Sequence, residues 1–151
     1  MRREVKTCAP SDPLSAALSM MDAMRCGCVV VVEQGRPVGM LTDRDACLCL
    51  GRKAKAPADV LVREAMSQPV VAVGVGATVD AALDAMTLHR VHRVPVVDDR
   101  GALAGLISLH DIAKEALDEL ALVERGETRT RAVRCRDVGR ALGETAGQNG
   151  R

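Results

Sequence analysis

The chain has 151 residues and contains no Phe, Tyr or Trp. A core must therefore be filled by aliphatic side chains and by the seven Met, and no base or sugar can stack on an aromatic ring. This absence argues against single-strand nucleic-acid platforms of the aromatic type. Hydrophobic residues nevertheless make up 48% of the chain, which is enough to bury a core.

An excess of charge of one sign is also missing, because 21 basic residues nearly cancel 20 acidic ones. Nothing global therefore predicts nucleic acid or an anionic membrane as an obligatory partner. The longest purely apolar run, CVVVV at 28–32, is too short to cross a bilayer, and the start MRREVK leads into no hydrophobic signal core. We expect a cytoplasmic protein without membrane contact, and we disfavour nucleic acid as a partner.

The six cysteines form two Cys-x-Cys pairs and no Cys-x-x-Cys motif. This spacing is not diagnostic of a metal site, so reduced, mostly buried cytosolic thiols are the favoured interpretation and no metal ligand is assigned. A thiol or metal sensor built on Cys26, Cys28, Cys47 and Cys49 stays open as an alternative.

An internal repeat is the strongest signal in the sequence. GMLTDRD at 39–45 returns as GLISLHD at 105–111, and an apolar stripe with helical spacing precedes each copy. The stripes are Leu14, Ala17, Leu18 and Met21, then Val79, Ala82, Leu83 and Met86. We expect the first helix to be capped by Asp12 with Pro13 at its first position, and the second to be capped by Thr78.

Each stripe is followed by two apolar runs around a polar turn that contains a glycine, Gly35 or Gly101, which predicts a hairpin. A second helix then begins at Asp43 and at Leu109. In the latter helix the expected inward side chains are Ile112, Ala113, Ala116, Leu117 and Leu120. With the short extended segments EVKTC and PVVAV, the sequence predicts an α/β fold of two tandem β-α-β-β-α repeats, packed around a pseudo-two-fold axis with a cleft between copies.

We predict the first repeat over residues 1–50, a linker over 51–65, and the second repeat over 66–120. Residues 121–151 form an Arg-rich tail that we expect to be partly helical or disordered.

The doubled hairpin ending resembles a tandem pair of CBS domains, the regulatory repeat of cystathionine beta-synthase and of the gamma subunit of AMP-activated kinases. The resemblance covers roughly residues 1–120. It implies regulation rather than catalysis, and an adenosine-containing ligand in the cleft between repeats. HRVHRVPVVD at 89–98 is similar to the basic segment with which kinase gamma subunits meet the ligand's phosphate.

The two repeated motifs permit two interpretations. The hydroxyl and the carboxylate three residues later form a helix-capping pattern, and they also present an acceptor pair for a ribose diol at a helix start. The residues assigned to ribose or adenosine are Thr42, Asp45, Ser108 and Asp111, with Gly39 and Gly105 allowing a close backbone approach.

His92 and Arg93 are assigned to phosphate. Four basic side chains, His89, Arg90, His92 and Arg93, are expected to enter one short strand where the motif of the other copy should arrive. A solvated basic edge is the alternative. The first copy has MRCGCVVV at this place, so the two clefts should differ.

The leading hypothesis is a regulatory module that binds AMP, ADP, ATP or a related adenosine ligand, requires no cofactor, and acts on a regulated protein in trans. A ligand-free structural dimerisation module is the alternative besides the thiol sensor. We expect a homodimer, since one pair leaves apolar helix faces to cover. No nucleophile lies beside a plausible base, and we interpret His110 as facing solvent, so we predict no enzyme and no catalytic residue.

Overall fold

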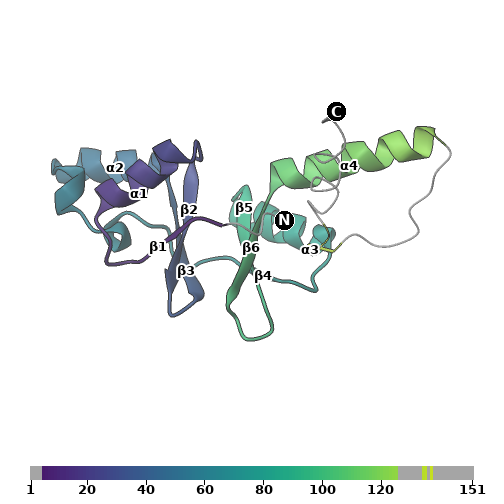
Figure 1. The fold of residues 1–151 in the computed structure, drawn as a ribbon, viewed down its shortest axis with the longest axis horizontal. Coiled ribbons are helices and arrows are strands. Elements are labelled where there is room, and N and C mark those ends of the chain that lie inside the picture. Colours follow the sequence, from purple (N-terminus) through teal and green to yellow (C-terminus); the bar gives the residue numbers. More distant parts are fainter. Residues whose placement is uncertain (1–4, 126–133, 136, 138–151) are drawn as a thin grey trace, which may run out of the picture. The chain divides into compact units, whose positions relative to one another are not determined.

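The computed structural model describes residues 5–125, 134, 135 and 137, and the chain divides into two compact units, residues 4–70 and the chain from residue 71 onward. The first contains β1 (Thr7–Cys8), α1 (Leu14–Ala23), β2 (Cys28–Glu33), β3 (Arg36–Thr42), α2 (Asp43–Lys53) and the short helices η1 (Pro57–Asp59) and η2 (Val62–Glu64). The second contains β4 (Val73–Gly74), α3 (Val79–His89), β5 (Arg93–Val97), β6 (Leu103–Ser108) and α4 (Leu109–Glu124) (Figure 1). The predicted order β-α-β-β-α is confirmed in both units.

The sheets of the two units have the same topology. Their strand orders are β1-β2-β3 and β4-β5-β6, and in each the first pair is parallel while the second is an antiparallel hairpin. A register shift recurs at Val31/Val32 and at Val96/Val97. Gly35 and Gly101 have φ values of +79° and +78°, the left-handed conformation that these turns require. The repeat therefore extends to details of the backbone.

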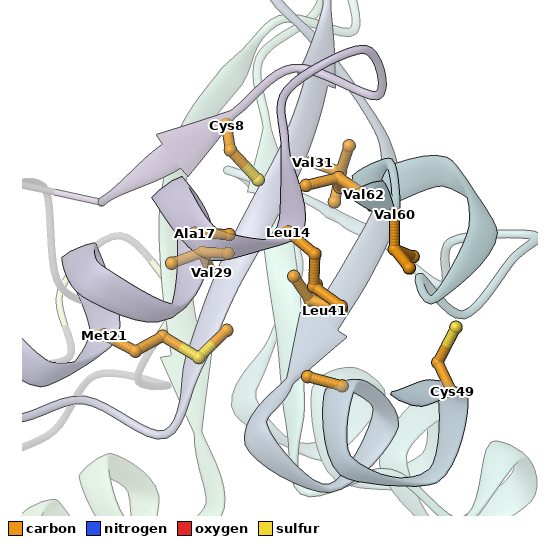
Figure 2. Packing of buried hydrophobic residues seen from close by; sticks show 11 residues of the cluster. Cys8, Leu14, Ala17, Met21, Val29, Val31, Leu41, Cys49, Val60 and Val62 are labelled. Carbon is orange, nitrogen blue, oxygen red and sulfur yellow. The ribbon is translucent and has the colours of Figure 1, made fainter. Parts of the chain in front are cut away.

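The core of the first unit lies between one face of its sheet and its two helices (Figure 2). Val29 and Val31 alternate along β2 and meet Leu14 and Met21 of α1, because successive strand residues point to opposite faces. The full set is Cys8, Leu14, Ala17, Met21, Val29, Val31, Leu41, Ala46, Cys49, Val60 and Val62. Aliphatic and sulfur-containing side chains fill this core, as the lack of aromatic residues predicts.

The second unit repeats this arrangement with equivalent positions. Val94 and Val96 of β5 pack with Met86 of α3 and Ile107 of β6. The buried set is Ala82, Met86, Val94, Val96, Ile107, Ile112 and Cys135. The predicted helical stripes are thus confirmed as the inward faces of α1 and α3.

The predicted start of the first helix is wrong by one position. Pro13 is the N-cap of α1, and the Asp12 carboxylate instead accepts a hydrogen bond of 2.8 Å from the Ala9 amide. The free amide of Leu14 finds its acceptor in the backbone oxygen of Val60, 2.8 Å away. A distant segment supplied the acceptor that a side-chain cap would otherwise provide. The cap predicted at Thr78 is confirmed, since its Oγ1 accepts from the Ala81 amide at 3.2 Å.

The segment expected as a linker is part of the first unit. Val60 and Val62 are fully buried in its core, and the Val62 and Arg63 amides donate to the backbone oxygens of Asp12 and Pro10. Sequence reasoning missed this because the apolar residues at 60–62 are too few to show periodicity.

Helix α4 differs most from expectation. Ile112 is buried, but Ala113, Ala116, Leu117 and Leu120 are exposed, with 67% of Leu117 and 62% of Leu120 accessible. The later turns of α4 run beyond the sheet that its first turn covers (Figure 1). Leu117 and Leu120 lie on these later turns.

The predicted tail falls mostly outside the described residues. Its first residues, 121–124, continue α4. Cys135 is fully buried, so at this point the segment is not a solvated tail. Among the described helices, none has the length and apolar character needed to span a membrane.

Candidate functional site

Both repeated motifs form the same reciprocal cap at the start of a helix. In the first unit the hydroxyl of Thr42 donates to Oδ2 of Asp45 at 2.7 Å, the Thr42 amide donates to the same oxygen at 3.1 Å, and the Asp45 amide donates to Thr42 Oγ1 at 3.1 Å. Ser108 and Asp111 repeat these bonds at 2.6, 3.0 and 3.2 Å. The capping interpretation of the two motifs is therefore confirmed in both units.

The cap also determines what these side chains can do for a ligand. Each hydroxyl donates one hydrogen bond and accepts another within the cap, and each carboxylate is held half-buried at a helix N-terminus. A carboxylate has two oxygens with about four acceptor sites, and the cap bonds of Asp45 use only Oδ2. Asp45 and Asp111 are thus fixed acceptors, while Thr42 and Ser108 orient them.

The structure brings the predicted phosphate residues next to the cap of their own repeat. Arg93 is the first residue of β5 and lies opposite Ser108 across the β5–β6 pair. The Leu109 amide, at the start of α4, donates to the backbone oxygen of His92 at 2.9 Å. His92 and Arg93 are both exposed, so their side chains are accessible to solvent.

The four basic side chains do not enter one strand as expected. His89 is the last residue of α3, and Arg90 is its C-cap in the left-handed conformation with φ of +54°, so both precede the strand. The chain reverses direction between α3 and β5, and His89 and Arg90 lie where the helix ends and this turn begins. His110 is exposed, as predicted.

The first unit has the same backbone frame with different side chains. Cys28 lies opposite Thr42, and the Asp43 amide donates to the backbone oxygen of Gly27 at 3.2 Å. Gly27 and Cys28 therefore occupy the places of His92 and Arg93. A Cβ at Gly27 would lie 3.2 Å from Oδ2 of Asp43, so this position is crowded by a carboxylate where the second unit has a basic pair.

Gly39 has a structural reason that the sequence did not reveal. A Cβ there would lie 2.8 Å from Sδ of Met66 and 3.1 Å from the backbone oxygen of Ser67. The residue beside it, Met40, exchanges backbone hydrogen bonds of 3.1 and 2.8 Å with Ser67. The close approach at Gly39 is thus made by the chain itself, and the expectation that a ligand approaches Gly39 has no support in this geometry. Gly105 is buried in β6, opposite Val96.

The cysteines that the sequence offered as a possible sensor differ in their burial. Cys28 and Cys49 are buried, Cys47 is exposed, and Cys26 is intermediate. Across residues 5–125, 134, 135 and 137, no three or more His, Cys, Asp or Glu side chains gather in a way that could hold a metal ion. Burial, reinforced by the Asp12 carboxylate, raises the pKa of the Cys8 thiol to about 11, so Cys8 is an unreactive neutral thiol.

The repeated fold and the duplicated cap agree with comparison to known proteins. The family described as CBS domain matches residues 1–51 and 62–118. The chain belongs to the CBS domain family. This CBS domain protein is 35% identical over 112 residues to an uncharacterized protein of Methanopyrus kandleri, covering 74% of the chain and 57% of that relative. It is 35% identical over 116 residues to the CBS domain-containing protein YhcV of Bacillus subtilis, covering 75% and 79%.

A longer relative and three solved structures complete the comparison. Inosine-5'-monophosphate dehydrogenase of Thermoplasma acidophilum is 31% identical over 110 residues, which are 73% of the chain but 21% of the enzyme. A CBS-domain containing protein of Agrobacterium tumefaciens superimposes with a TM-score of 0.66 at 32% identity, covering 76% of the chain and 90% of that structure.

Two further structures contain bound groups. Hypoxic Response Protein I, with two coordinated zinc ions, matches at a TM-score of 0.68 and 28% identity, covering 76% of the chain and 94% of that structure. A CBS domain pair solved in complex with 5'-methylthioadenosine and S-adenosyl-L-methionine matches at 0.67 and 21%, covering 76% and 92%, a likeness of fold.

Proposed function

We propose that this CBS domain protein is a regulatory module that binds an adenosine-containing ligand, such as AMP, ADP or ATP, and acts on a protein partner in trans. The single observation that carries the proposal is the juxtaposition of Arg93 with the Ser108–Asp111 cap across one strand pair. A cation and a fixed carboxylate side by side match the two ends of a nucleotide's ribose phosphate. A structural neighbour that holds two adenosine derivatives supports the choice of ligand class.

In this proposal each residue has a separate role. Asp111 accepts hydrogen bonds from the ribose diol, and Ser108 holds that carboxylate in place through its hydroxyl. Arg93 and His92 contact the phosphate. Asp45 and Thr42 repeat the sugar-binding role without a neighbouring basic pair, so the first unit contributes to nucleoside rather than phosphate recognition.

Isothermal titration with AMP and with adenosine tests these roles in the full chain. Arg93→Ala should weaken the binding of AMP by about 10- to 150-fold and leave the binding of adenosine nearly unchanged, because only AMP carries the phosphate. Asp111→Ala should weaken the binding of both ligands. Arg100→Ala, an exposed arginine in the β5–β6 turn, is the matched control and should change neither.

Three results would contradict the proposal. They are no measurable binding of either ligand to the wild type, equal losses of both ligands in Arg93→Ala, and loss of AMP binding in the Arg100→Ala control. The first would favour the ligand-free dimerisation module. Thermal unfolding of each variant without ligand separates lost binding from lost folding.

We further propose that the module is a homodimer that uses the exposed stripe of α4. The stripe comprises Leu109, Ala113, Ala116, Leu117 and Leu120, spaced as in a helix that packs along a second helix. Exposed apolar side chains in such a contiguous row are typical of an interaction surface. A second copy presents the same row, which is self-complementary around a two-fold axis.

Sedimentation equilibrium at tens of micromolar, roughly the range for an interface of standard size, tests the dimer. Leu117→Glu should convert the dimer to a monomer, whereas Leu88→Glu, at another exposed leucine on α3, should not. A wild type that sediments only as a monomer would refute the dimer while leaving the nucleotide proposal standing. The cytoplasmic location stays a prediction.

A further inference from the structure

In each unit a short segment that follows the second α-helix packs against the start of the first α-helix. In the first unit this segment lies at 61–64. Leu61 forms an antiparallel bridge with Pro13, the Val62 amide donates to the Asp12 oxygen at 2.9 Å, and the Glu64 amide donates to the Leu61 oxygen at 2.9 Å. The segment thus pairs with the residues that lead into α1 and then turns away.

The second unit contains the same contacts, made by residues near the end of the sequence. Arg134 forms an antiparallel bridge with Thr78. The Cys135 amide donates to the Ala77 oxygen at 3.0 Å, and the Asp137 amide donates to the Arg134 oxygen at 2.8 Å. Pro13 and Thr78 are the N-caps of α1 and α3, so the two segments meet their units in the same register.

Burial and sequence agree with this equivalence. Val62 and Cys135 follow the bridging residue in each segment, and both are 0% exposed members of their cores. The sequences VLVRE at 60–64 and VRCRD at 133–137 share a valine, an arginine and an acidic residue at matching positions.

We propose that the loop before the first helix of each unit is a docking surface for such a segment, and that the chain's own Arg134, Cys135 and Asp137 are its occupant in the second unit. Two further hydrogen bonds from side chains of this segment support the assignment. Nη1 of Arg134 donates to the Gly76 oxygen at 3.4 Å, and Sγ of Cys135 donates to the Thr78 oxygen at 3.4 Å. The second CBS unit therefore extends well past α4, to residue 137.

The chemistry that the surface selects follows from these contacts. It requires a backbone amide for the Ala77 oxygen and a small, neutral side chain for the buried position, since an unpaired charge there would be desolvated. Burial raises the pKa of the Cys135 thiol, which keeps it neutral. Valine fills the same position in the first unit, so the two side chains should be exchangeable.

Hydrogen exchange on the full chain tests the docking. In the wild type the amide of residue 135 should be protected, together with that of Ala82 in the first turn of α3. Cys135→Asp should raise exchange at both amides about tenfold or more, because the segment undocks locally. Cys135→Val, which places the first unit's residue in the second, should keep both amides protected. Cys47→Asp, at an exposed cysteine, is the control and should change neither.

The first unit supplies the reciprocal experiment. Val62→Asp should raise exchange at Leu14, whose amide donates to the Val60 oxygen, whereas Val62→Cys should be tolerated. Alkylation of the wild type, mapped by mass spectrometry, should modify Cys135 roughly 100-fold more slowly than Cys47. Equal alkylation of the two thiols, an unchanged Ala82 amide in Cys135→Asp, or equal disruption by Cys135→Val would overturn the proposal. None of these measurements depends on a nucleotide.

Discussion

The two CBS units share a backbone and differ in the chemistry placed on it. In both, a hydroxyl and a carboxylate cap the second α-helix with hydrogen bonds that match within about 0.1 Å. In both, the amide of the helix's first residue donates to the backbone oxygen of the residue just before the middle strand of the sheet. Opposite the cap, however, the first unit has Gly27 and Cys28 where the second has His92 and Arg93. Asp43 of the first unit corresponds to Leu109 of the second.

This difference separates what the repeat needs in order to fold from what it can use for binding. The cap occurs in both units and satisfies helix amides in both, so folding alone explains its presence. The basic pair occurs in one unit, and in the part of the chain that the structure describes neither side chain forms a hydrogen bond or ion pair. The exposed side chain of Arg93 is therefore stronger support for the nucleotide proposal than the repeated motif is.

The largest expected effects come from equivalent core positions. Leu41 in β3 and Ile107 in β6 are both 0% exposed and lie opposite Val29 and Val94. Leu41→Ala and Ile107→Ala should each lower the free energy of unfolding by about 2–5 kcal/mol, through lost burial and the cavity left behind. Hydrogen exchange should rise mainly in the mutated unit. Leu88→Ala, with 78% of the side chain exposed, should cost less than about 0.5 kcal/mol. A uniform rise of exchange over both units would contradict the division of the chain into two compact units.

The caps should give a smaller and equal effect. Asp45→Ala and Asp111→Ala each remove one carboxylate that bonds a backbone amide and a hydroxyl, so each should cost about 0.5–2 kcal/mol in urea unfolding. Asp99→Ala, at an exposed turn position, serves as the control. Destabilisation of only one of the two cap variants would contradict the equivalence of the two caps.

The smallest effect concerns pH and occurs in the first unit. The Leu61 amide and the Lys53 ammonium bond the two oxygens of Glu64 at 2.8 and 2.9 Å and lower its pKa from the ordinary 4.5. A lowered pKa of a carboxyl group stabilises the folded state at pH values above the ordinary pKa. This contribution is lost as the pH falls through the folded-state pKa. Glu64→Gln should therefore be less stable than the wild type near neutral pH, with the difference shrinking on acidification below 4.5.

Urea unfolding of wild type and Glu64→Gln across this range measures the effect, with Glu33→Gln, at an exposed strand end, as the control. The effect is small because both side chains of the ion pair are about one-third exposed. A difference that grows on acidification would show that the sign is wrong.

Much of the candidate site could be predicted from the sequence, because it is formed by residues a few positions apart. Thr42 and Asp45, like Ser108 and Asp111, lie three residues apart, and that spacing by itself places a carboxylate over the amides of a helix start. The pairing of Arg93 with Ser108 could not be predicted from the sequence, because it depends on the register of a hairpin whose turn differs in length between the repeats. The exposure of Leu117 and Leu120 was likewise missed, since periodicity gives an apolar face but not what covers it.

The sequence by itself determined the α/β class, the order β-α-β-β-α in two copies, the glycine turns and the reciprocal caps. Each of these follows from side-chain period or from bonds between residues a few positions apart. Only the tertiary structure decided where the segments beyond α2 and α4 go. Val62 and Cys135 dock on the loops before α1 and α3 through contacts that span 50 and 58 residues (62 − 12 and 135 − 77). Each docking contact consists of one small buried side chain and one backbone hydrogen bond. Such contacts produce no periodic pattern of apolar residues in the sequence, so only the folded chain reveals them.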